Sequence, residues 1–208
     1  MLKNRQYAFE AIAYVLVNKC RENDIIVRLT AVGALNSLLY DSDGLIDTFA
    51  QYSDSVISSL YALANECSQL ECCEEILSCI NLLLMSIKEI GKHIGDNTAD
   101  IVVGPLVSIW ENALEQKAHL RGNVLSILSC VATSVGTNYS QQQLHSIALP
   151  MISTSLGSTA RNMHPFLIED ALNLWLTLVR QLSVSDPNLE NIFGIIVTLL
   201  ADGFEHTR

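Results

Sequence analysis

The sequence predicts an all-α protein, built as a superhelical solenoid of about four and a half antiparallel helix pairs. Three observations predict this fold class. Apolar residues recur at three- and four-residue spacing along almost the whole chain. Runs of strict apolar–polar alternation with hairpin turns are absent, and the breaks between helical segments recur at regular distances. With 208 residues, the chain is long enough to bury a sizeable core.

The apolar pattern predicts nine helices, in four pairs and a single last helix. Residue spacing places them at about 4–20, 24–40, 48–66, 71–91, 98–115, 117–136, 140–156, 163–182 and 188–203. In the helix at 71–91 the buried face begins with Ile76, Ile80 and Leu83, and in the helix at 163–182 it includes Leu167 and Leu174. These spacings place the apolar side chains on one face of each helix.

Regular intervals between the helices predict repeats. The second helix of each pair begins near Asp24, Glu71, Lys117 and Met163, at intervals of 47, 46 and 46 residues. Helix pairs of about 40 to 47 residues are typical of HEAT or armadillo arrays, and two helices in each unit favour HEAT repeats.

Other landmarks keep the same period. Pro105 and Pro150 are 45 residues apart, and each falls inside the first helix of a pair, where proline is expected to kink the helix. Arg28 and Arg121 are 93 residues apart, which is two periods.

The repeats form one array without a domain boundary. We expect its units at 1–40, 48–91, 98–136 and 140–182, followed by an unpaired helix at 188–203. That last helix is apolar and has no partner helix after it. This predicts that the chain is a piece of a longer solenoid. It also predicts that the apolar side chains of the last helix are exposed, among them Ile195, Ile196 and Leu199.

The charge excludes some partners. The formal net charge is −10, and residues 29–208 hold seven basic and nineteen acidic side chains. Such a chain repels phosphate backbones, so we expect no direct binding of nucleic acid, whereas a basic protein partner fits. The longest apolar runs reach ten residues, too short for a membrane span, so we expect no membrane insertion.

Neither catalysis nor a metal or cofactor is predicted. The sequence has no phosphate-binding loop, its histidines lack the four-residue pairing of a helical metal site, and its cysteines form no C-x-x-C pair. Cys73 and Cys79 continue apolar helical stripes, which favours free thiols in a reducing compartment. Asp170 is interpreted as binding a neighbouring helix, through an arginine, rather than as an acid or base. Trp110 and Trp175 are interpreted as core anchors.

Several strings resemble a known family. Residues 24–66 contain V-R-L-T-A-V-G-A-L, an acidic turn and a helix entered through Phe49, and this stretch resembles importin-β-type karyopherins. Residues 106–136, which contain S-I-W-E, and residues 166–179, F-L-I-E-D-A-L-N-L-W-L-T-L-V, are similar to further segments of that family, especially its importin-eleven group. Ser108 and Ala171 depart from the family pattern, in which a proline and a glycine are common.

The resemblance implies a segment of a nuclear transport receptor that shuttles between nucleus and cytoplasm. It implies a scaffold for a basic cargo protein and for phenylalanine-glycine nucleoporins. The Ran GTPase binds the family through amino-terminal repeats that have no counterpart here. A HEAT-repeat scaffold outside transport, in a phosphatase or splicing complex, is the alternative.

Acidic residues of the second helices are the candidate protein-binding site. They are Glu71, Glu74, Glu75, Glu89 and Glu169. In HEAT solenoids the second helices line the concave side, so these carboxylates are positioned to attract a lysine- and arginine-rich cargo. The alternative, of equal weight, is that they are solvated charges that keep an apolar solenoid soluble.

Overall fold

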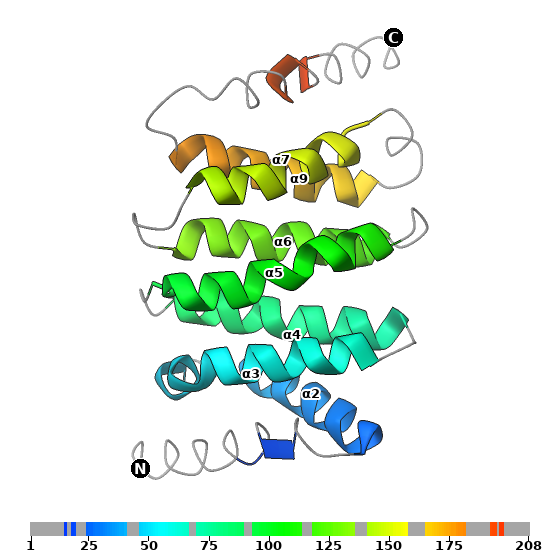
Figure 1. The fold of residues 1–208 in the computed structure, drawn as a ribbon, viewed down its shortest axis with the longest axis vertical. Helices are drawn as coiled ribbons and strands as arrows, with labels where there is room; N and C mark the ends of the chain where they lie inside the picture. Colours follow the sequence, from blue (N-terminus) through cyan, green and yellow to red (C-terminus); the bar gives the residue numbers. More distant parts are fainter. Residues whose placement is uncertain are drawn as a thin grey trace.

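The computed structural model shows a stack of antiparallel helices (Figure 1). It describes residues 15, 18–19, 24–40, 46–66, 70–89, 93–113, 118–135, 141–157, 165–181, 192–194 and 196–197. The helices are α2 (Ile25–Tyr40), α3 (Ile46–Glu66), α4 (Leu70–Glu89), α5 (Asp96–Asn112), α6 (Ala118–Ser134), α7 (Gln141–Ser155) and α9 (Pro165–Gln181). The described residues form no strand, only an isolated bridge between Ile94 and Val135. The predicted all-α repeat fold is confirmed.

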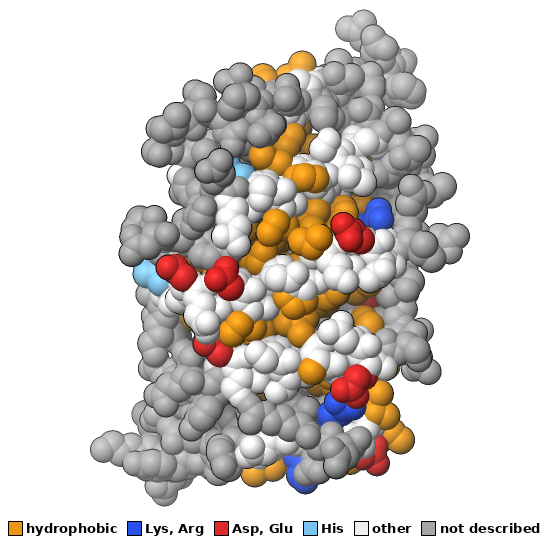
Figure 2. Space-filling model, in the orientation of Figure 1, with side chains coloured by type: hydrophobic (Ala, Val, Ile, Leu, Met, Phe, Trp, Pro, Cys, Tyr) orange, Lys and Arg blue, Asp and Glu red, His pale blue; other side chains and the backbone are white. Residues whose placement is uncertain are grey.

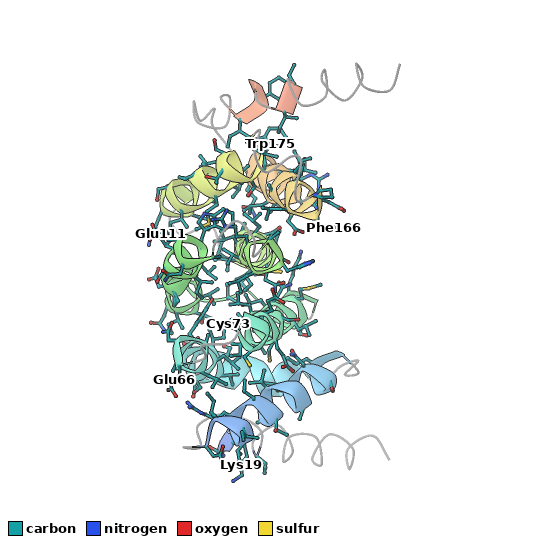
Figure 3. All side chains as sticks on the ribbon, turned by 90° about the vertical axis from the view of Figure 1, so that its right-hand side faces the viewer. Lys19, Glu66, Cys73, Glu111, Phe166 and Trp175 are labelled. Atoms are coloured by element: carbon teal, nitrogen blue, oxygen red, sulfur yellow. The ribbon has the colours of Figure 1, made fainter. Side chains whose placement is uncertain are left out.

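The helices lie in two layers, which the side view shows as two columns (Figure 3). The first-helix layer contains α3, α5 and α7. The second-helix layer contains α4, α6 and α9, with α2 packed on α4 at the amino-terminal end. Within each pair, α3 packs on α4, α5 on α6 and α7 on α9. Neighbouring helices of the second-helix layer contact each other more extensively than those of the first, as expected for the inner side of a curved stack.

Helix starts recur at nearly constant intervals. Helices α2, α4, α6 and α9 begin 45, 48 and 47 residues apart, and α3, α5 and α7 begin 50 and 45 residues apart. The expected division into units stays a prediction, because the first helix at 4–20 and the last at 188–203 fall largely outside the described residues.

The core is one continuous apolar cluster between the two layers. Its fully buried members include Leu84 on α4, Leu125 and Leu128 on α6, and Leu174 on α9. On the face formed by the first-helix layer, hydrophobic side chains run in bands, and the acidic side chains are dispersed between them (Figure 2). Because no single pair encloses its apolar side, stacking provides the burial that stabilises each repeat.

Individual landmarks behave in part as expected. Pro105 and Pro150 both lie inside helices, α5 and α7. Trp110 is buried in the core, whereas Trp175 is only half-buried and stacks on Phe193 with 6.4 Å between ring centroids.

The prediction of an exposed terminal patch is wrong for one of its residues. Ile196 packs partly against the core, because the described part of that segment lies on the end of the stack, where Ile192 is buried. Ile195 and Leu199 lie outside the described residues.

Hydrogen bonds between neighbouring repeats hold the layers in register. The amide of Asn81 on α4 donates to Ser126 Oγ on α6 at 2.9 Å. In the first-helix layer, the hydroxyl of Tyr61 on α3 donates to the Val102 carbonyl on α5 at 2.8 Å. These side chains connect helices about one repeat apart in sequence, so they fix the relative rotation of adjacent pairs.

Candidate functional site

The predicted acidic residues lie on two helices of the second-helix layer. The first four, Glu71, Glu74, Glu75 and Glu89, are on α4, and Glu169 is on α9. The side chains of Glu75 and Glu169 are exposed and that of Glu74 is half-buried, whereas those of Glu71 and Glu89 lie outside the described residues.

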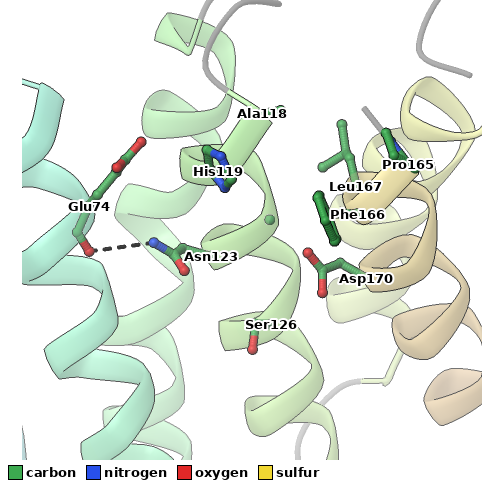
Figure 4. Close-up of a pocket in the computed structure, with 10 residues that line it drawn as sticks. Glu74, Ala118, His119, Asn123, Ser126, Pro165, Phe166, Leu167 and Asp170 are labelled. Atoms are coloured by element: carbon green, nitrogen blue, oxygen red, sulfur yellow. Dashed lines mark hydrogen bonds between the residues drawn. The ribbon is translucent and has the colours of Figure 1, made fainter. Parts of the chain in front are cut away.

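A cleft of about 700 Å³ lies between α4, α6 and α9 (Figure 4). Glu74 forms its wall on α4, and the first turns of α9 form the opposite wall. The floor is the amino-terminal half of α6. The lining residues are Glu74, Ala118, His119, Gly122, Asn123, Ser126, Pro165, Phe166, Leu167 and Asp170.

The floor of the cleft is tied to α4. The side-chain amide of Asn123 donates to the backbone carbonyl of Glu74 at 3.4 Å, and Ser126 accepts the hydrogen bond from Asn81. The bond from Asn123 uses the backbone rather than the carboxylate of Glu74. The carboxylate therefore stays available at the cleft.

The wall on α9 combines an aromatic ring with a carboxylate. The side chain of Phe166 is 70% exposed, which is unusual for phenylalanine, and it faces the cleft together with Asp170 (Figure 4). The two residues are four apart on one helix and therefore project from the same face, one turn from each other.

The carboxylate of Asp170 reaches α6 at Gly122. A Cβ built on Gly122 would lie 2.6 Å from Asp170 Oδ2, closer than real side chains approach. The carboxylate of Asp170 can lie this close to α6 only because residue 122 is a glycine without a side chain. Partial burial, together with the charge of Glu169, raises the pKa of Asp170.

The predicted arginine partner of Asp170 is not found. Among the described residues, no arginine forms an ion pair with Asp170. Arg121, the neighbour of Gly122 on α6, lies instead over the Trp110 ring at 4.9 Å from its centroid. It projects towards α5, inside its own pair, because adjacent helical residues point in directions about 100° apart.

A similar close approach occurs at the neighbouring helix pair. Glu75 Oε1 on α4 lies 3.1 Å from the position of a Cβ on Gly33 of α2. Glycines on α2 and α6 thus face carboxylates on the next helix of the same layer.

Some acidic residues of the first-helix layer are structural instead. Asp54 accepts hydrogen bonds from Asn97 and Thr98. Glu66 accepts two from the Arg28 guanidinium, which lower the pKa of Glu66. These carboxylates join helices, whereas no described side chain forms an ion pair with the carboxylate of Glu75 or Glu169.

The cysteines within the described residues are not joined in disulfides. Cys79 and Cys130 are buried, and Cys72 and Cys73 are half-buried. No group of three or more potential metal ligands occurs among the described residues. In the same part of the chain, no helix is sufficiently long and apolar to cross a membrane.

Sequence reasoning missed the cleft itself. It named Glu74 and Glu169 as binding candidates and interpreted Asp170 as a contact to a neighbouring helix, but it left out Phe166 and Gly122, which belong to two different repeats. A glycine in a helix interior and a phenylalanine at a helix start are the signals that could have indicated it.

Comparison with known proteins finds similarity to importin-11. Residues 122–208 match a family model described as "Importin-11-like, TPR repeats". Human importin-11 and mouse importin-11 are each 24% identical to this chain over 204 residues, which is 98% of this chain. The chain spans about a fifth of the length of these relatives. No solved structure matches the chain significantly.

The repeat length refines that description. Helix pairs here recur every 45 to 50 residues, longer than the 34 residues or so of a TPR repeat and closer to a HEAT repeat. The similarity extends over 98% of this chain and therefore includes the strings at 24–66, 106–136 and 166–179. The chain is a helical-repeat protein that is similar in sequence to importin-11, and the predicted resemblance to the importin-eleven group is confirmed.

Proposed function

We propose that the chain is part of a nuclear transport receptor and serves there as a protein-binding scaffold. The observation that carries the proposal is the similarity to importin-11 along 98% of this chain. A stack of helix pairs supports it, because such a stack offers extended layers for protein contacts without a catalytic centre. The similarity favours transport over a scaffold in a phosphatase or splicing complex, and binding over enzymatic activity.

In this proposal the two layers bind different partners. Basic cargo binds the second-helix layer at Glu71, Glu74, Glu75, Glu89 and Glu169, and phenylalanine-glycine nucleoporins bind between helices of the first-helix layer. The Ran GTPase binds repeats outside this chain. The receptor shuttles through the nuclear pore between nucleus and cytoplasm.

A competition assay at the nuclear envelope tests the transport role. Fluorescently labelled chain is added to permeabilised cells, and its intensity at the nuclear rim is measured with and without excess unlabelled human importin-11. We expect accumulation at the rim and displacement by importin-11. A distribution equal to that of an inert protein of the same size would refute the proposal.

Charge reversal tests the acidic surface. Glu169→Lys on α9 is compared with Glu111→Lys on α5, because both side chains are exposed and only the first lies in the second-helix layer. Binding of an arginine- and lysine-rich peptide is expected to weaken markedly for Glu169→Lys and little for Glu111→Lys, and to fall with added salt. Equal losses would mean that net charge alone attracts the peptide.

A further inference from the structure

We propose that the cleft between α4, α6 and α9 receives a lysine or arginine side chain of a partner protein, whose aliphatic part lies on Phe166 and whose charge pairs with Asp170. The inference rests on the proposed function and deepens it. It assigns a place and a mode of contact to one basic residue of the partner.

The first step is the pairing of ring and carboxylate on α9. Phe166 and Asp170 share one helix face, and both face the cleft. Lysine and arginine carry an apolar stem that ends in a cation, so one such side chain can cover the ring and reach the carboxylate. The ring also attracts a cation placed over it.

The second step is electrostatic. Asp170 is half-buried beside Gly122, and among the described residues no cation pairs with it. The opposite wall carries Glu74, and exposed Glu169 lies beside Asp170. His119 also lines the cleft, at the amino-terminal end of α6. An entering cation gains attraction from three carboxylates, and it replaces water around a carboxylate that is already partly desolvated.

The third step identifies the occupant as a protein segment. A net charge of −10 disfavours nucleic acid and other polyanions. The described residues offer no group of ligands for a metal ion. The cleft is bordered by three helices of one layer, so an extended segment that lies across the layer can insert a side chain while its backbone crosses α6.

Gly122 is the positioning residue of the cleft. A methyl group at position 122 would collide with Asp170 Oδ2 and displace the carboxylate. The same substitution at Gly104 of α5 meets nothing within 4 Å. Gly122→Ala and Gly104→Ala are therefore a matched pair of variants.

The test is a binding measurement with two labelled peptides of the same Gly-Ser-rich sequence. One peptide carries two arginines, and the other carries neutral citrulline in their place. Fluorescence anisotropy at low ionic strength gives the affinities for the wild-type chain, for Asp170→Asn and for Phe166→Ala. The same affinities are measured for Gly122→Ala, for Gly104→Ala and for the control Glu111→Gln.

We expect the wild type to bind the arginine peptide more tightly than the citrulline peptide. Asp170→Asn should lower the affinity for the arginine peptide about tenfold, the loss of one charge-assisted hydrogen bond, and should leave the citrulline peptide unaffected. Phe166→Ala should lower it about threefold or more. Gly122→Ala should weaken binding, whereas Gly104→Ala and Glu111→Gln should change it less than twofold.

Other outcomes contradict the inference in distinguishable ways. If Glu169→Lys weakens binding of the arginine peptide but Asp170→Asn and Phe166→Ala do not, the acidic surface binds and the cleft assignment is wrong. If Asp170→Asn and Glu111→Gln weaken binding equally, only net charge acts and both proposals for this surface fail. Absence of any preference for the arginine peptide would also overturn both.

Discussion

At the residue scale, Asp170 carries a cost in stability that suits a binding role. Its carboxylate is partly withdrawn from water against α6, and its neighbour Glu169 repels its negative charge. Side chains at functional sites often lower the stability of the folded protein compared with a residue selected for stability alone. The ionised side chain therefore opposes folding, and a cation bound beside it would reduce this cost.

Replacing Asp170 by asparagine should stabilise the protein at neutral pH. The pKa of Asp170 is higher in the folded than in the unfolded state, so the ionised group destabilises the fold at any pH above both pKa values. This penalty disappears as the pH falls below the pKa of an ordinary aspartate, where the group is protonated in both states. Thermal unfolding should show a higher Tm for Asp170→Asn at neutral pH and a smaller difference in acid.

The control for this comparison is Glu111→Gln, which removes an equal charge from an exposed position. A Tm for Asp170→Asn that lies below the wild type at neutral pH would show that the carboxylate stabilises the fold, against our account.

Tyr61 shows the opposite case, a buried polar group that is fully used. Its side chain is 4% exposed, its hydroxyl donates to the Val102 carbonyl, and burial raises its pKa. Tyr61→Phe keeps the ring and removes the bond, so it should lower the free energy of unfolding by about 0.5–1.5 kcal/mol. Urea unfolding measures the change. Ser58→Ala, at an exposed hydroxyl that bonds within α3, should have a smaller effect, and equal effects would argue against the role of the Tyr61 bond.

At the scale of elements, carboxylates join helices of adjacent pairs. Asp54 on α3 accepts hydrogen bonds from Asn97 at 3.0 Å and from Thr98 at 2.5 Å, in the first turn of α5. The amino-terminal end of a helix carries partial positive charge, so a carboxylate there is favoured. Equivalent positions need not use equivalent partners: Arg28 pairs with Glu66, whereas Arg121, two periods later, stacks on Trp110.

Asp54→Ala should loosen the junction between α3 and α5. Two hydrogen bonds to a charged acceptor are lost, which should lower the free energy of unfolding by about 1–3 kcal/mol. Urea unfolding followed by circular dichroism measures the loss, with Glu111→Ala on α5 as the control for charge. The account fails if the two variants are equally stable.

At the scale of the whole molecule, stability depends on contacts between neighbours. Helix α6 packs against α4, α5, α7 and α9, so it is the most embedded of the described helices. In repeat proteins each pair is stabilised largely by its interfaces. A substitution that disrupts the packing of α6 should therefore also destabilise the helix pairs on either side of it.

Leu125→Ala tests this dependence. The side chain is fully buried on α6, and its truncation should cost about 2–5 kcal/mol of the free energy of unfolding. Leu176→Ala, at a side chain 39% exposed on α9, should cost much less. Both values come from urea unfolding followed by circular dichroism. Similar losses at the two positions would contradict the packing described above.

The sequence by itself determined the helices and their period. The second helices expected near Glu71, Lys117 and Met163 begin at Leu70, Ala118 and Pro165. The helices can be predicted from local spacing alone, because apolar residues at three- and four-residue intervals favour a helix whatever that helix packs against. The family strings are likewise properties of contiguous residues, and they pointed to the importin-eleven group without any structure.

Only the tertiary structure decided what those helices place together. The cleft joins Glu74, Gly122 and Phe166 from three helices about one repeat apart in sequence, and their meeting depends on how each helix is rotated about its axis. That rotation is set by interlocking side chains and by bonds such as Asn81 to Ser126, which no local pattern encodes. For the same reason Asp170 lies against a glycine instead of the expected arginine: residues 121 and 122 point in different directions, and packing chose which one faces α9.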